Sequence, residues 1–104
     1  MKLQLQHRAI RVRLDRAEFD SLLRDLTLRR ELRHGDDALF AVEICAGPRL
    51  EFTRGAEGWW LQLPIGELEA YAPTLPRREG LHFDLGDGLG IDLEVDIRGK
   101  SATC

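Results

Sequence analysis

The feature that most constrains the fold of this 104-residue chain is a pattern that occurs twice. Residues 9–23 read AIRVRLDRAEFDSLL, and residues 58–72 read GWWLQLPIGELEAYA. Aligned on each other, they place Val12 with Leu61 and keep an apolar strand followed by a helical segment in both copies. The sequence therefore predicts an internal duplication, which constrains the architecture without indicating a reaction.

The flanking segments extend the same match. KLQLQ at 2–6 aligns with RLEFT at 49–53, and ALFAVEI at 38–44 aligns with LGIDLEV at 89–95. The offset between the copies drifts from 47 to 49 to 51, as small loop insertions would cause. We expect one domain over 1–104, with repeat one over about 2–46, repeat two over about 49–97 and a frayed tail over 98–104.

Each half has the pattern strand, strand, helix, strand, strand. Period-two alternation, as in Ile10, Val12 and Leu14, indicates half-buried strands. Asp15 with Glu18 three residues later predicts a capped helix start. We predict an α+β fold: two ββαββ repeats forming one antiparallel-rich curved sheet or partial barrel, with two short helices packed on it.

Composition excludes several classes of protein. No apolar run is long enough for a transmembrane helix, and the N-terminus lacks a signal-peptide core, so a cytoplasmic location is expected. The net charge of −3 argues against a nucleic-acid partner. Residues 1–46 carry nine basic and eight acidic side chains, against six and ten in residues 47–104, an asymmetry that favours self-association or orients a partner. Cys45 and Cys104 have no metal or redox spacing.

The opening MKLQLQHRAIRVRLDRAEFDSLL resembles that of a bacterial family of small proteins of unknown function. That family starts Met-Lys and has an Ile-Arg-x-Arg-Leu strand running into a helix. Its second helix, capped by Leu-Pro, is similar to Leu63-Pro64 through Tyr71, and its last strand is similar to Ile91 through Val95. The family's Lys-Asp-Phe-Ala-Cys-like ending is echoed only by Asp96 and Cys104. The resemblance covers most of the chain and implies a fold, but no activity.

Strand parity predicts one polar sheet face, which would be concave if the sheet curls. Its members are Gln4, Gln6, Arg11, Arg13, Glu43, Cys45, Glu51, Trp60, Gln62, His82, Asp84, Asp92, Glu94 and Asp96. Arginine forks bind carboxylate or phosphate, and a tryptophan offers a stacking surface. We expect an anionic or aromatic ligand to contact Arg11, Arg13, Trp60, Gln62 and His82; the alternative is a solvated face with cross-strand ion pairs.

The Trp59-Trp60 dipeptide places one indole in the core and one outside it, because neighbouring strand residues point to opposite faces. Parity with Leu61 and Leu63 assigns Trp59 to the core. An exposed Trp60 would be a contact for a dimer or another protein, unless a loop or helix covers it.

Metal and catalytic motifs are absent from the sequence. The acidic residues around Gly86-Asp87-Gly88 lack calcium-loop spacing, and the three histidines lack zinc spacing. No metal, cofactor or catalytic residue is therefore predicted. A weaker hypothesis is an enzyme that uses His82 with Asp84 or Glu43 as acid and base.

The leading hypothesis is a non-catalytic cytoplasmic binding or protein-interaction module that can self-associate. Its partner would be a second copy or another protein, with no nucleic acid and no membrane. The alternative is a binding protein for a small anionic or aromatic ligand on the polar sheet face.

Overall fold

The computed structural model describes residues 1–56 and 58–96. Eight strands and two α-helices follow one another along these residues. They are β1 (Lys2–Leu5), β2 (Ala9–Leu14), α1 (Arg16–Leu23), β3 (Leu28–His34), β4 (Asp37–Gly47), β5 (Glu51–Gly55), β6 (Gly58–Pro64), α2 (Ile65–Tyr71), a 3₁₀ turn (Ala72–Thr74), β7 (Leu81–Gly86) and β8 (Leu89–Val95). The predicted α+β class is confirmed, while Ile97 and the predicted tail lie outside the described residues.

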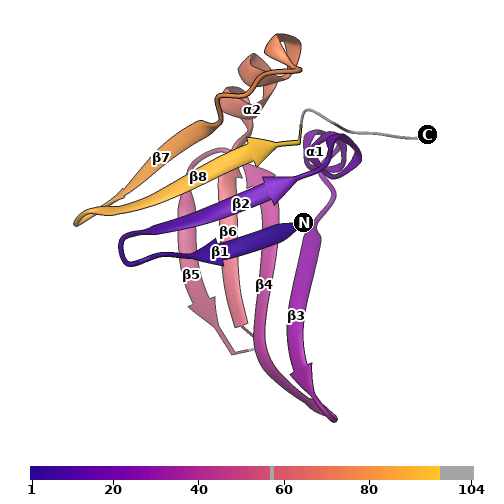
Figure 1. The fold of residues 1–104 in the computed structure, drawn as a ribbon, viewed down its shortest axis with the longest axis vertical. Coiled ribbons are helices and arrows are strands. Elements are labelled where there is room, and N and C mark those ends of the chain that lie inside the picture. The colour runs from indigo at the N-terminus through magenta and orange to yellow at the C-terminus, as the bar shows by residue number, and fades with distance from the viewer. Residues whose placement is uncertain (57, 97–104) are drawn as a thin grey trace.

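The strands form two separate four-stranded sheets. Sheet A has the order β1-β2-β8-β7, and sheet B has the order β3-β4-β6-β5. Figure 1 shows the strands of sheet A running across those of sheet B, with both helices near the same end of the molecule. The prediction of one curved sheet or partial barrel is therefore wrong for the described residues, which form no closed barrel. The reason is that each helix carries the chain from one sheet to the other, so the hairpins on either side of it never share a sheet.

Parallel pairing at the centre of each sheet joins the two halves of the chain. In sheet A, β2 runs parallel to β8, and in sheet B, β4 runs parallel to β6. The edge strands are the antiparallel hairpin partners of these central strands. They are β1 and β7 in sheet A and β3 and β5 in sheet B. Each sheet therefore contains one hairpin from each half.

The ladder registers of the two sheets correspond at a spacing of 49 residues for every strand except β3, which corresponds to β7 at a spacing of 53, as the pairs Arg30–Val42 and Phe83–Ile91 show. The pair Leu3–Val12 has its counterpart 49 residues further on in Phe52–Leu61. In the parallel ladders, Val12 pairs with Leu93 and Leu61 pairs with Ile44, which is again a shift of 49 for both partners. The ladders thus give one spacing for all strands but β3 and β7, whereas the sequence alignment used 47 and 51 for the flanking ones.

The core lies between the inward faces of the two sheets and beneath the helices. Its buried cluster takes side chains from both halves: Val12, Leu14, Phe19, Leu22, Val42, Ile44, Leu61, Leu63, Leu68, Tyr71, Phe83, Ile91, Leu93 and Val95. The ring of Phe19 in α1 meets the edge of the Tyr71 ring in α2, with centroids 6.0 Å apart at 80°. The alternating apolar positions of the strands and the helical stripes therefore bury one shared core.

Helix α1 starts where the sequence predicts. The Asp15 side chain accepts from the Glu18 backbone N–H at 2.7 Å, and Glu18 accepts from the Asp15 N–H at 2.9 Å, which completes the capping box. The N-terminal ammonium of Met1 also donates to Glu18, at 2.6 Å. Arg30 of β3 donates to the Met1 carbonyl, so the chain start ties sheet A to sheet B.

Candidate binding site

The structure divides the predicted polar face between two surfaces. Arg11, Arg13 and His82 lie on the outer face of sheet A, whereas Trp60 and Gln62 lie on the outer face of sheet B. Because the inward faces of both sheets enclose the same core, these outer faces point away from each other. The predicted ligand-binding residues therefore do not form one concave site.

The outer face of sheet A carries a row of polar side chains in register. Gln4, Arg11, Asp92 and His82 are successive cross-strand partners over the four strands. Arg11 pairs with Glu94, and that hydrogen bond raises the pKa of the Arg11 guanidinium. Two hollows, of about 480 and 330 Å³, lie along this face.

His82 has a carboxylate partner, but not either of the two that the sequence suggested. Its Nδ1 lies 2.6 Å from an Asp92 oxygen, and its ring lies over Gly90, where a side chain would leave no room. Asp84 instead accepts the Gly86 backbone N–H at 2.8 Å and closes the β7–β8 turn, while Glu43 lies on sheet B. The His82 side chain is 65% exposed, so this contact has the character of a surface ion pair.

On the outer face of sheet B, Gln62 has a structural role. It is buried, it donates to the Arg49 carbonyl at 2.7 Å, and it fills the space above Gly47. Trp60 is half-buried and lines a shallow hollow of about 250 Å³ with Arg29 and Glu43. Sequence parity placed both side chains on the correct face of β6, but only Trp60 presents a surface to a partner.

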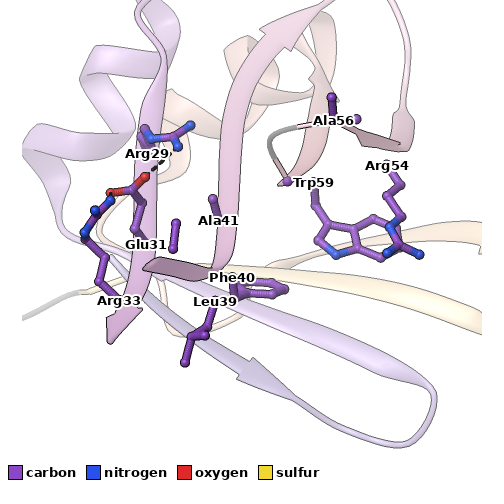
Figure 2. A pocket seen from close by; sticks show the side chains of 12 residues that line it. Arg29, Glu31, Arg33, Leu39, Phe40, Ala41, Arg54, Ala56 and Trp59 are labelled. Carbon is purple, nitrogen blue, oxygen red and sulfur yellow. Dashed lines mark hydrogen bonds and ion pairs between the residues drawn. The ribbon is translucent and has the colours of Figure 1, made fainter. Parts of the chain in front are cut away.

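A hollow of about 500 Å³ lies at the end of sheet B where the β3–β4 hairpin extends beyond β6. We call this hollow the notch. Its lining residues are Arg29, Glu31, Arg33, Ala38, Leu39, Phe40, Ala41, Arg54, Gly55, Ala56, Gly58 and Trp59. Figure 2 shows the charged side chains of β3 on one side, Trp59 and Arg54 on the other, and Leu39 and Phe40 at one end.

Strand lengths create the notch. The ladder between β4 and β6 begins at the pair Val42–Trp59, so the first five residues of β4 lie beyond it. Four of them pair with β3, and Leu39 lies at the register shift of that ladder. Gly58 marks the inner limit, because a Cβ atom there would lie 2.5 Å from the Ala41 carbonyl oxygen. Its φ of +135° also favours glycine. The small residues Ala41, Gly55 and Gly58 leave the notch open.

Three arginines and one glutamate line the notch, so its described side chains carry a net charge of +2. Glu31 accepts from Arg29 at 2.7 Å and from Arg33 at 3.3 Å. The hydrogen bond from Arg29 is the main cause that lowers the pKa of Glu31 and raises that of Arg29. Glu31 is therefore ionised at neutral pH and holds two guanidinium groups along one wall.

Arg54 on the opposite wall has a different environment. Its guanidinium carbon lies 5.8 Å from the centroid of the Trp59 ring, and Trp59 in turn stacks on Phe52 with centroids 5.0 Å apart. Among residues 1–56 and 58–96, no hydrogen bond or ion pair engages the Arg54 guanidinium. Its N–H donors are thus available within that part of the chain, next to an aromatic surface.

Sequence reasoning missed this site. It assigned Trp59 to the core by parity and named no site residue in the segment that forms β3. The useful signal was the alternation of Arg29, Glu31 and Arg33, which places three charged side chains on one face of β3. The hollow itself depends on β4 extending past β6, which no local pattern reveals.

Other site classes find no support in the described residues. No group of three or more His, Cys, Asp or Glu residues there could hold a metal ion. Neither helix of this part of the chain has the length and apolarity to cross a bilayer.

Burial raises the pKa of the half-buried Cys45 thiol, and the nearby Asp25 and Glu43 add to the shift. The thiolate, which is the reactive form, is therefore disfavoured.

No protein-family model matches the chain, and comparisons with curated proteins and with solved structures find no similar protein. The resemblance to a bacterial family of small proteins therefore stays a prediction.

Proposed function

We propose that this protein is a non-catalytic binding module whose binding surface is the notch of sheet B. The observation that carries the proposal is a hollow of about 500 Å³ that combines three arginines with aromatic and aliphatic side chains. Ligand sites typically have volumes of this order and combine apolar contact surface with a few converging polar groups. The outer face of sheet A has hollows too, but no tryptophan, tyrosine or phenylalanine lines them.

Mapping by NMR tests this proposal. We expect that, in a screen of anionic, neutral and cationic fragments and short peptides, binding compounds shift the indole N–H signal of Trp59 and the backbone signals of Leu39 and Phe40. Arg54→Gln should weaken these shifts, and Arg11→Gln on sheet A should leave them unchanged. Shifts confined to the outer face of sheet A, or no binding compound at all, would contradict the proposal.

A second candidate function is self-association, favoured by exposed aliphatic side chains at the hairpin ends. Leu5 in sheet A is 66% exposed, and Leu32 and Leu39 in sheet B are 61 and 63% exposed. Phe40, the ladder partner of Leu32, is half-buried. Large apolar side chains in such positions often mark protein contacts. Trp60 remains part of this hypothesis as a half-buried aromatic on the outer face of sheet B.

Sedimentation velocity tests the second candidate. If the leucines form a dimer contact, the sedimentation coefficient rises with protein concentration, and the double variant Leu32→Glu with Leu39→Glu stays monomeric. Leu26→Glu, which changes another half-exposed leucine away from the β3–β4 hairpin, should associate as the unchanged protein does. A protein that is monomeric at all concentrations would rule this candidate out.

We also propose that the two ββαββ halves arose by duplication. The spacing of 49 residues that relates the β1–β2 ladder to the β5–β6 ladder, and the β2–β8 ladder to the β4–β6 ladder, supports this origin, as does the placement of one hairpin from each half in each sheet. A duplicated homodimer would give this arrangement, with the two halves related by a pseudo-twofold axis.

A further inference from the structure

We infer that the ligand of the notch is a small organic anion, in which one carboxylate or phosphate group is attached to a flat apolar body. This inference rests on the proposed function and specifies the chemistry that the notch would recognise.

The described lining of the notch is opposite in charge to the whole chain. The described lining carries a net charge of +2, whereas the 104 residues together carry −3. A concave surface concentrates the field of its charged groups more than a flat one does. An anion is therefore the favoured occupant, and a cation is disfavoured by the same charges.

The three arginines differ in how many of their N–H donors are already bonded to other groups of the protein. Arg29 donates to Glu31 and Glu43, both at 2.7 Å, and Arg33 donates to Glu31 and to the Asp36 carbonyl. These bonds hold the two β3 arginines in place and use part of their donor capacity. Arg54 lacks such bonds within the described residues, so it is the anchor that can donate two parallel hydrogen bonds to a carboxylate or phosphate.

The apolar wall determines the rest of the ligand. Leu39, Phe40 and Trp59 line the same hollow as the arginines, and the Phe52–Trp59 stack holds the indole beside the Arg54 guanidinium. Bare phosphate would leave this wall in contact with water. A ring attached to the anion would bury it and add contact area that an inorganic ion cannot supply.

The experiment is isothermal titration calorimetry of the full chain at low salt with five probes. Phenyl phosphate and benzoate carry both an anion and a ring, and they distinguish a phosphate from a carboxylate source. Inorganic phosphate lacks the ring, benzyl alcohol lacks the charge, and benzamidine reverses the charge. We expect phenyl phosphate or benzoate to bind at least about tenfold more tightly than the other three probes, as charge-assisted paired hydrogen bonds allow.

A matched pair of variants assigns the binding to the notch. Arg54→Gln should weaken binding of the anionic ring by about tenfold or more. Arg49→Gln should change it little, because Arg49 is 78% exposed and outside the notch while the loss of charge is the same. A thermal melt of both variants verifies that they are folded.

The possible outcomes separate this inference from the proposed function. If benzyl alcohol or benzamidine binds as tightly as phenyl phosphate and still shifts the Trp59 signal, the notch binds ligands but the anion inference is wrong. If the anionic rings bind and Arg54→Gln binds them equally well, the anion inference is also wrong. If none of the five probes binds, the anion inference fails, and the broader NMR screen decides the proposed function independently.

Discussion

Separating the two halves of the chain should abolish folding of both. Peptides 1–47 and 48–104 are each expected to lack a cooperative unfolding transition, because the central parallel pairs β2–β8 and β4–β6 both join one half to the other. Of the fourteen residues in the buried cluster, peptide 1–47 holds only six. Chains of this size bury a small fraction of their surface and are marginally stable even with a complete core, so the loss of more than half of the cluster residues or of the central strand pairs should prevent folding. Circular dichroism during urea titration measures the effect.

Mixing provides the control for this experiment. An equimolar mixture of the two peptides should recover a cooperative transition, since it restores both sheets and the complete core. The duplication hypothesis also allows one peptide to pair weakly with itself, and sedimentation would detect this. A peptide that unfolds cooperatively as a monomer would show that one half forms its own core, contrary to the sheet order.

Phe19→Ala should cause the largest loss of stability among single substitutions in the helices. Phe19 is fully buried and packs edge-on against Tyr71, so α1 and α2 both contact the space that its ring fills. Truncation of a buried phenylalanine typically costs about 3–5 kcal/mol, which combines lost burial with the cavity left behind. Urea denaturation should show a lower midpoint with an unchanged slope.

Leu26→Ala is the matched control for Phe19→Ala. Sequence periodicity puts both residues on the apolar stripe of the first helix, but the helix ends at Leu23 and Leu26 is half exposed. Its truncation should therefore change the free energy of unfolding by less than about 1 kcal/mol. Equal costs for the two variants would contradict the core described above.

Local signals predicted the individual elements well. The capping pair Asp15 and Glu18 marked the start of α1, and Pro64 with Pro73 bounded the second helix, where the structure places α2 at Ile65–Tyr71. Alternation identified the buried face of the strands, as in Val12 and Leu14. These features depend on residues within a few positions of each other, so one sequence is enough to reveal them.

Partners distant in the sequence could not be predicted in the same way. Alternation shows which side of a strand is apolar, but it does not show that Val12 lies beside Leu93 or Ile44 beside Leu61. The single-sheet prediction failed at this step, and the predicted ligand site failed with it. Arg11 and Trp60 have the same parity in corresponding strands, yet those strands belong to different sheets.

The notch was missed for a related reason. Its arginines come from β3 and β5, and its aromatic residues come from β4 and β6. None of these strands contains a motif for binding. The site exists because a long hairpin extends past a shorter one, and this difference in length becomes visible only when the strands are paired.

The most direct test of the notch as a binding site is to change its charge at Ala38, an exposed lining residue paired with Arg33. The measurement is the dissociation constant of phenyl phosphate for the unchanged protein, Ala38→Lys and Ala38→Glu. Our account predicts tighter binding with lysine and weaker binding with glutamate, because the anion would lie within a few ångströms of the new charge. Identical affinities in all three proteins, or a change in the same direction for both variants, would contradict it.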